Sequence, residues 1–166
     1  MTPSRFFFDI SRCSGCMACV VACLDQNDLP EDSPGFRDVT KIETGSYPFA
    51  EISFLSISCF NCTHAPCVMV CPTRAIKRRI PENVVEVNQD LCIGCRSCLM
   101  ACPFGATRFL EGKRMSECHF CSERIKYGME PACVRICPTR ALDFGPVERA
   151  SGENQEKAPE TEAGSI

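Results

Sequence analysis

The hydrophobic residues of the chain fall into short runs that are separated by polar residues, Pro and Gly. Runs of this length, several with alternating apolar and polar positions, are typical of short β-strands. No run of about 18 uncharged apolar residues occurs, so the sequence predicts no membrane span. The predicted strands cover residues 6–10, 37–43, 52–57, 75–77, 84–87, 107–110 and 141–144.

The most unusual feature of the composition is cysteine, with 16 among 166 residues, while Trp is absent. Without the cysteines only about a third of the chain is apolar, so the aliphatic core is thin. We therefore expect inorganic groups or covalent links to stabilise the fold. The formal net charge of -3 argues against a nucleic-acid partner, and no Walker A or G-x-G-x-x-G pattern indicates a nucleotide site.

The cysteines form four groups of four, and none is left over. The first and third groups have the spacing C-x2-C-x2-C-x3-C, the second C-x2-C-x4-C-x3-C and the fourth C-x2-C-x11-C-x3-C. Three thiolates within seven residues fit one side of an iron–sulfur cubane, and the fourth cysteine, followed by Pro, then binds the other cluster of a two-cluster ferredoxin. Pro follows the last cysteine in groups two, three and four, whereas group one has Leu24. The spacing predicts four 4Fe-4S clusters as cofactors.

Two other chemistries compete for these thiols. Disulfides need an oxidising compartment, and thiols packed two residues apart are a poor framework for them. Zinc sites usually use two C-x2-C pairs separated by a dozen or more residues, a pattern that only the fourth group resembles. Zinc stays an alternative, mainly at the fourth group.

The architecture depends on which groups exchange their last cysteines. Residues 72–91, between groups two and three, contain two strands and a turn at 81–83, which is the hairpin that the middle of a two-cluster module needs. Strands 52–57 and 107–110 are expected to pair as the outer strands of this module, and strands 6–10 and 141–144 to pair around groups one and four. The sequence thus predicts an α+β fold of two 2[4Fe-4S] ferredoxin-like modules, the inner inserted into the outer. Sequential pairing, one with two and three with four, is the alternative.

This scheme divides the chain and its ligands. The outer module covers residues 1–27 and 111–146, a loop-rich spacer 28–51 and the inner module 52–110, while the acidic segment 147–166 is predicted to be a disordered tail. The predicted ligands are Cys13, Cys16, Cys19 and Cys137 for cluster one; Cys118, Cys121, Cys133 and Cys23 for cluster two; Cys59, Cys62, Cys67 and Cys102 for cluster three; and Cys92, Cys95, Cys98 and Cys71 for cluster four.

The cysteine motifs at 11–19, 59–76, 92–98 and 118–139 resemble those of the four-cluster ferredoxin-like subunits of molybdenum and tungsten oxidoreductases. The dimethyl sulfoxide reductase family is the best-known case, and similar small subunits accompany some tungsten aldehyde oxidoreductase-type enzymes. The resemblance extends over residues 5–145 and implies the nested pairing of the groups. It also implies a catalytic partner with a tungsten- or molybdenum-pterin cofactor, and a flavin subunit is a further candidate partner.

Bound clusters would change the net charge of the protein. Sixteen thiolates and four oxidised cluster cores would bring it to about -11, so basic residues near the ligands are candidates for raising reduction potentials or docking an acidic partner. Lys77, Arg78 and Arg79 form the candidate docking patch for an acidic partner. The two histidines, His64 and His119, lie inside cysteine groups and are expected to be neighbours of the clusters rather than catalytic residues.

The predicted function is an electron-transfer subunit, not an enzyme on its own, that relays single electrons to or from a catalytic subunit. A free-standing polyferredoxin and a zinc-stapled interaction module are the alternatives, and self-stacking of the subunit is also considered. The start of the sequence, residues 1–9, shows no leader, which predicts a cytoplasmic complex. Export as the passenger of a signal-bearing partner stays open.

Overall fold

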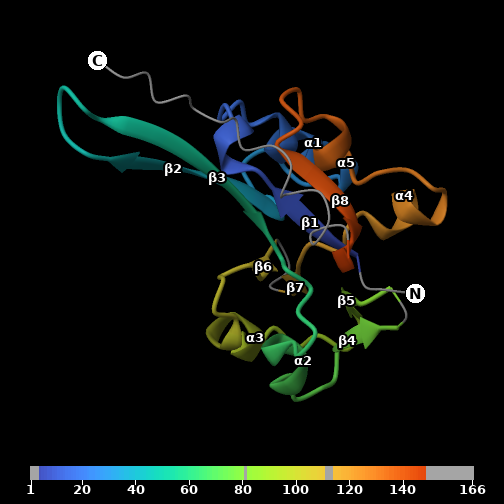
Figure 1. The fold of residues 1–166 in the computed structure, drawn as a ribbon. Coiled ribbons are helices and arrows are strands. Elements are labelled where there is room, and N and C mark those ends of the chain that lie inside the picture. The colour runs from blue at the N-terminus through green and yellow to red at the C-terminus, as the bar shows by residue number, and fades with distance from the viewer. Residues whose placement is uncertain (1–3, 81, 111–113, 149–166) are drawn as a thin grey trace.

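The computed structural model describes residues 4–80, 82–110 and 114–148, shown in Figure 1. In these parts the strands form four separate two-stranded antiparallel sheets, β1–β8, β2–β3, β4–β5 and β6–β7. The strands are β1 (Ser4–Phe8), β2 (Arg37–Thr44), β3 (Glu51–Ser58), β4 (Ile76–Arg79), β5 (Val84–Val87), β6 (Arg108–Phe109), β7 (Met115–Ser116) and β8 (Leu142–Pro146). The helices are α1 (Ala18–Gln26), α2 (Pro66–Met69), α3 (Ser97–Ala101), α4 (Ser122–Lys126) and α5 (Ala132–Arg135).

The first and last strands of the described chain pair with each other, as the sequence predicts. Phe6 lies opposite Phe144 in the β1–β8 register. Both rings contact Phe120, with centroid distances of 5.1 Å from Phe6 and 5.2 Å from Phe144, and Phe6 and Phe144 are 5.3 Å apart. This aromatic triad joins the two ends of the described chain to the loop that carries the fourth cysteine group.

The predicted hairpin between the second and third cysteine groups is confirmed as β4–β5. Ile76 pairs with Val87 and Arg79 with Val84. Asn83, which precedes β5, has φ of 58°, a left-handed conformation that Asn tolerates better than most residues. Ile76, Val84 and Val85 are buried. Since Val84 and Val85 are consecutive in β5, side chains on both faces of this small sheet pack into the protein.

The predicted pairing of strand 52–57 with strand 107–110 is wrong. β3 pairs over eight residues with β2, from Arg37 opposite Ser58 to Thr44 opposite Glu51. β6 pairs instead with β7. A hairpin closed by residues 45–50 costs less loop-closure entropy than a pairing across residues 58–106, and the two-residue β6 offers little to compensate. The strand predicted at 37–43 is confirmed as β2.

The β2–β3 ribbon projects from the body of the protein, as Figure 1 shows. Its base is buried at Arg37, Val39, Ser56 and Ser58, whereas its outer half is largely exposed. Only the base of the ribbon therefore contributes to the interior. The ribbon also spans the predicted boundary between the spacer and the inner module, since β2 lies in the spacer and most of β3 in the module.

Sulfur forms much of the interior. One buried group contains Cys19 and Cys133 packed with Val39, Val134 and Leu142. A second combines Cys67 and Cys98 with Ile76, Val85 and Met115, and a third combines Cys23, Cys59 and Cys118 with Phe36 and Phe120. The thin aliphatic core expected from the composition is thus a core of thiols and a few apolar side chains.

The helices are short and pack in pairs, α1 against α5 and α2 against α3. Helices this short are not stable alone in water, so their packing must hold them. Figure 1 shows α1, α5, β1 and β8 at one end of the molecule and α2, α3, β4 and β5 at the other. In the described residues, none of the helices has the length and apolar character to cross a membrane. The predicted tail lies mostly outside the described residues, which end at residue 148.

Candidate metal centres

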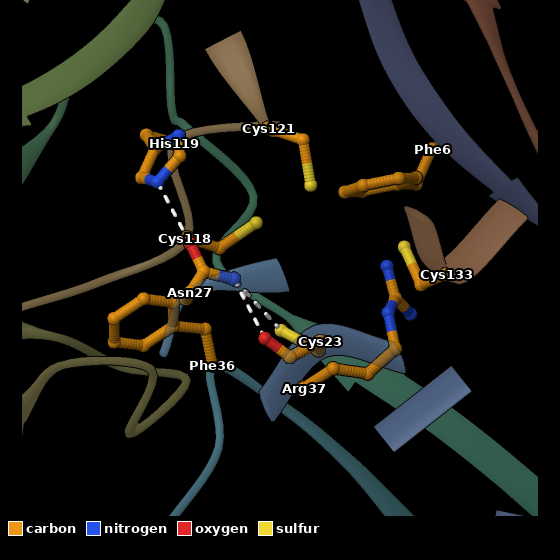
Figure 2. Close-up of a pocket in the computed structure, with 9 residues that line it drawn as sticks. All are labelled: Phe6, Cys23, Asn27, Phe36, Arg37, Cys118, His119, Cys121 and Cys133. Atoms are coloured by element: carbon orange, nitrogen blue, oxygen red, sulfur yellow. Dashed lines mark hydrogen bonds between the residues drawn. The ribbon is translucent and has the colours of Figure 1, made fainter. Parts of the chain in front are cut away.

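One hollow, with about 290 Å³ of open space, is lined by four cysteines, Cys23, Cys118, Cys121 and Cys133 (Figure 2). These are the four residues predicted for cluster two. Three of them come from the fourth cysteine group, and Cys23 comes from α1. The rest of the wall is formed by Phe6, Asn27, Phe36, Arg37 and His119.

A second hollow, of about 320 Å³, is lined by the four cysteines predicted for cluster one. Three come from the first group, and the fourth is the last cysteine of the fourth group. Its cysteines are Cys13, Cys16, Cys19 and Cys137. The two hollows therefore exchange their last cysteines between groups one and four.

The cysteines of groups two and three lie near one another at the other end of the molecule. Cys67 and Cys98 belong to one buried group of side chains, against which the partly buried Cys62, Cys71 and Cys92 pack. Cys59 belongs to the neighbouring buried group, and Cys102 packs against it. Burial raises the pKa of Cys67 to about 12, and the nearby charges of Glu117, Cys102 and Cys62 act in the same direction. The division of these cysteines between clusters three and four stays a prediction.

The C-x3-C step shared by all four groups forms a helical turn each time. Cys19 and Cys23 are four residues apart in α1, so both side chains lie on one face of the helix. They nevertheless line different hollows, because the hollows lie one turn apart along that face. α5 repeats this between Cys133 and Cys137. α1 and α5 thus each connect the same two neighbouring hollows.

The same backbone path recurs in groups one and three. Gly15 has φ of 67° and Gly94 of 69°, and two residues later Met17 and Arg96 have φ of 61° and 63°. These left-handed residues precede α1 and α3. A Cβ on Gly15 would lie 2.5 Å from the Phe54 ring, so this position requires the residue without a side chain.

Groups two and four end in another repeated turn. Thr73 Oγ1 lies 3.7 Å from Cys71 Sγ, and Thr139 Oγ1 lies 3.7 Å from Cys137 Sγ. Burial acts to raise the pKa of both thiols, but hydrogen bonds from these hydroxyls and from backbone N–H groups outweigh it and lower the pKa. The turn favours the thiolate, which is the form that binds metal.

Backbone and side-chain N–H groups point at further thiols. Asn61 N lies 3.4 Å from Cys59 Sγ, and Met115 N lies 3.4 Å from Cys92 Sγ. In the Figure 2 hollow, Asn27 Nδ2 lies 3.7 Å from Cys23 Sγ. Hydrogen bonds to cluster sulfurs are one of the ways in which a protein sets reduction potential. Together with the four-thiol hollows, these donors fit 4Fe-4S clusters.

Glu117 was not among the predicted site residues. It is 5% exposed, and burial raises the pKa of its carboxyl to about 7. Cys59 Sγ donates to Glu117 Oε2 over 3.4 Å, while Glu117 Oε1 is buried and has no hydrogen-bond partner among the described residues. The sequence offers only its position next to Cys118 as a signal.

Arg37 was also missed. Its side chain is buried at the start of β2 and lines the hollow of Cys23, Cys118, Cys121 and Cys133. Basic residues near ligands in sequence were considered as cluster neighbours, but Arg37 is 14 residues from the nearest cysteine, Cys23. The fold brings it there.

His119 lies in the wall of the same hollow, as expected for a cluster neighbour. Its Nε2 is 3.0 Å from Asn27 Oδ1, and its Nδ1 accepts a hydrogen bond of 3.1 Å from Ser122 N. Burial lowers the pKa of its ring, which therefore stays neutral near pH 7. His64 lies near the second group, and its role stays a prediction.

The candidate docking patch divides into three different environments. Arg79 forms ion pairs with Glu82 at 3.3 Å and Glu86 at 2.5 Å. Arg78 donates to the Thr63 carbonyl. Lys77 is exposed on β4, so it is the residue of the three best placed to meet a partner.

Within residues 4–80, 82–110 and 114–148, no group of three or more His, Cys, Asp or Glu side chains is arranged to hold a single metal ion.

Comparison with known proteins places the chain in a family. Residues 50–147 match the 4Fe-4S dicluster domain, and residues 10–26 match a 4Fe-4S binding domain. The B subunit of the anaerobic dimethyl sulfoxide reductase of Escherichia coli (strain K12) is 44% identical over 159 residues, which cover 89% of this chain and 75% of that protein. The corresponding subunit of Haemophilus influenzae is 39% identical over 160 residues, covering 89% and 76%. Protein NrfC of Escherichia coli (strain K12) is 40% identical over 148 residues, covering 87% and 66%.

Proposed function

Because the chain belongs to the 4Fe-4S dicluster family and is a non-catalytic electron-transfer subunit of an oxidoreductase complex, we propose that it relays single electrons through four 4Fe-4S clusters. The electrons pass to or from a catalytic partner that carries a tungsten- or molybdenum-pterin cofactor. A bound 4Fe-4S cluster supplies reversible one-electron chemistry. The residues of this chain hold the clusters, exclude water from them and set their potentials.

The observation that carries the proposal is the composition of the two four-thiol hollows. Each hollow combines three cysteines of one group with the last cysteine of another, which is the exchange typical of two-cluster ferredoxins. Four thiols per hollow match the four irons of a cubane. If groups two and three exchange their last cysteines in the same way, they supply the ligands of clusters three and four.

The nested arrangement of two ferredoxin-like modules is part of this proposal. The pairing of β1 with β8 around groups one and four supports it, and so does the β4–β5 hairpin between groups two and three. The packing of α1 on α5 and of α2 on α3 also supports it, because each pair joins the two groups that would share clusters. Sequential pairing would instead require groups one and two to line a common hollow.

The identity of the partners rests on the relatives and on the resemblance of the cysteine motifs. Two of these relatives are subunits of anaerobic dimethyl sulfoxide reductases, which favours a multi-subunit oxidoreductase complex. A tungsten or molybdenum subunit, an added flavin subunit and stacking of the chain with itself stay predictions within that class. The cytoplasmic location also stays a prediction.

The test is an elemental count on the complex purified anaerobically from its native cells. We expect about sixteen Fe and sixteen acid-labile sulfides per chain, with Mo or W in the copurifying catalytic subunit. Full iron without Mo or W would favour the free-standing polyferredoxin. Stoichiometric zinc with little iron would overturn the proposal and support a zinc-stapled module.

A further inference from the structure

Arg37 is a charged side chain in the interior of the protein, with 3% of its surface exposed. It stands at the first position of β2, opposite Ser58 in the ribbon. Figure 2 shows its guanidinium beside Cys133, at the edge of the hollow that Cys23 and Cys118 also line. A permanent positive charge thus lies in the wall of a predicted cluster site.

The hydrogen-bond and ring partners of this guanidinium are neutral. Nη1 donates to Ser56 Oγ over 3.0 Å, and Nη2 donates to Ser58 Oγ over 3.0 Å. Its Cζ lies 4.4 Å from the centre of the Phe6 ring. These contacts fix the direction of the guanidinium plane without neutralising its charge.

In the parts of the chain that the structure describes, none of the ion pairs includes Arg37. The adjacent carboxylate, Asp38, accepts a hydrogen bond from Val39 N. Glu117, a buried carboxyl, contacts Cys59 instead. Because an isolated charge is costly to bury, an anion other than the carboxylates of the described residues would stabilise Arg37 in this position.

The groups that face Arg37 and can carry negative charge are thiols. Cys23, Cys118, Cys121 and Cys133 line the same hollow as Arg37. Figure 2 shows Cys133 beside the guanidinium. Four thiolates around an oxidised cubane core carry about -2 in total, and about -3 after reduction, so such a site supplies the missing anion.

We propose that Arg37 is the counter-charge of cluster two and raises its reduction potential. This inference rests on the proposed function, because it assumes that the hollow holds a 4Fe-4S cluster. A cluster held there would gain one electron from its redox partner in the complex, its net charge would fall by one, and no bond or proton at Arg37 would change. The interaction is stronger in the reduced state because the negative charge is larger.

We expect Arg37 to raise the reduction potential of cluster one by less than that of cluster two. Arg37 does not line the hollow of cluster one, but it bonds Ser56, whose Oγ lies 3.6 Å from Cys19 Sγ. The hydroxyl lies between the guanidinium and that site. The structure therefore assigns to Arg37 a graded effect, larger at cluster two than at cluster one.

The test is an anaerobic redox titration of the purified complex, followed by electron paramagnetic resonance, for Arg37→Gln, Arg37→Lys and the wild type. We expect Arg37→Gln to lower the potential of cluster two by at least the 59 mV that corresponds to a tenfold change in a one-electron equilibrium constant. Arg37→Lys, which keeps the charge, should recover most of this shift. The signal of cluster two is identified as the one that Cys121→Ser alters.

The matched control is Lys41→Gln, which removes one positive charge from the same strand, where Lys41 is exposed and paired with Glu43. We expect unchanged potentials in this variant. Equal shifts in Arg37→Gln and Lys41→Gln, or no shift in Arg37→Gln, would overturn the inference.

Iron and sulfide counts on each sample separate this inference from the proposed function. A wild type without clusters contradicts the proposed function, whereas a wild type with sixteen Fe and an unshifted Arg37→Gln contradicts only the role of Arg37. If Arg37→Gln loses cluster two, retention in Arg37→Lys supports the need for a charge. Loss in both variants would overturn an electrostatic role in favour of packing.

Discussion

At the scale of single residues, Gly15 shows how little space the first cysteine group leaves. Its φ of 67° costs an alanine about 1 kcal/mol, and the new Cβ would meet the Phe54 ring at 2.5 Å. We expect Gly15→Ala to destabilise the protein by about 2–3 kcal/mol and to lose cluster one before the others. Iron content and the temperature at which visible cluster absorbance is lost would measure this.

Gly128→Ala is the control for that substitution. Gly128 has a nearly equal φ of 70°, but no atom of residues 4–80, 82–110 or 114–148 lies within 4 Å of the position that a Cβ would take. It should therefore show the backbone cost alone, about 1 kcal/mol. Equal effects of the two substitutions would mean that the contact with Phe54 relaxes freely.

The burial of Glu117 leads us to expect that the stability of the protein depends on pH. Its carboxyl ionises at a pKa of about 7 in the folded protein, against 4.5 for an unperturbed Glu. Between these values the unfolded chain releases a proton that the folded protein keeps, so the free energy of unfolding falls as pH rises from about 4.5 to about 7 and then levels off. A neighbouring anionic cluster would strengthen the effect.

We expect Glu117→Gln to remove this part of the pH dependence, which amounts to roughly 3 kcal/mol at most. The measurement is the guanidinium midpoint for loss of cluster absorbance between pH 5 and 8, under anaerobic conditions, in both proteins. A variant with the same slope as the wild type would show that another group titrates there.

The two kinds of site residue differ in how far the sequence reveals them. The cysteines belong to local motifs, and these motifs, together with the predicted strand pairing and the family resemblance, predicted which thiols line the two hollows. Glu117 and Arg37 act through burial, which arises only when distant segments pack together. A single sequence gives no signal for that packing.

At the scale of the elements, the aromatic triad holds β8 to β1. Phe144 lies 5.3 Å from Phe6 and 5.2 Å from Phe120, ring centre to ring centre. We expect Phe144→Ala to destabilise the protein by about 2 kcal/mol, less than a fully buried Phe because the side chain is half-buried. The guanidinium midpoint for cluster loss would report it.

The same substitution at the tip of the ribbon is the control. Phe49 is 84% exposed, so Phe49→Ala should change the stability by no more than about 0.5 kcal/mol. A large loss at Phe49, or none at Phe144, would contradict the importance assigned to the β1–β8 seam.

The elements were predictable where pairing is local or where both partners have a strong pattern. The turn at 81–83 identified β4–β5, and the phenylalanines at 6–8 identified β1. The strand that forms β2 was predicted, but its pairing with β3 was missed, because the Pro and Gly residues of 28–51 indicated a loop-rich spacer outside the inner module. Alternation predicts a strand but does not identify its partner.

At the scale of the whole molecule, Lys77 is the basic residue of the candidate patch that stays exposed. We expect Lys77→Ala to weaken binding to an acidic partner subunit about threefold to fivefold at low salt, with the effect shrinking as ionic strength rises. Binding of the purified subunits at two salt concentrations would measure it.

Lys126→Ala provides the comparison, since it removes one charge from α4, where Lys126 is paired with Glu123. Binding should be unchanged. Equal weakening in the two variants would indicate a general effect of net charge rather than docking through β4.

The pairing of β1 with β8 also has a consequence for the order in which the protein is made. Translation proceeds at about 5–20 residues per second, so Cys13, Cys16 and Cys19 leave the ribosome on the order of ten seconds before Cys137 and β8 exist. During that time the first strand has no partner and three of the four thiols of one hollow stand alone. The β4–β5 hairpin, by contrast, needs only the chain up to Val87. Biosynthesis therefore completes the middle of the protein first, and a nascent chain cut short before Leu142 can never close its outer seam.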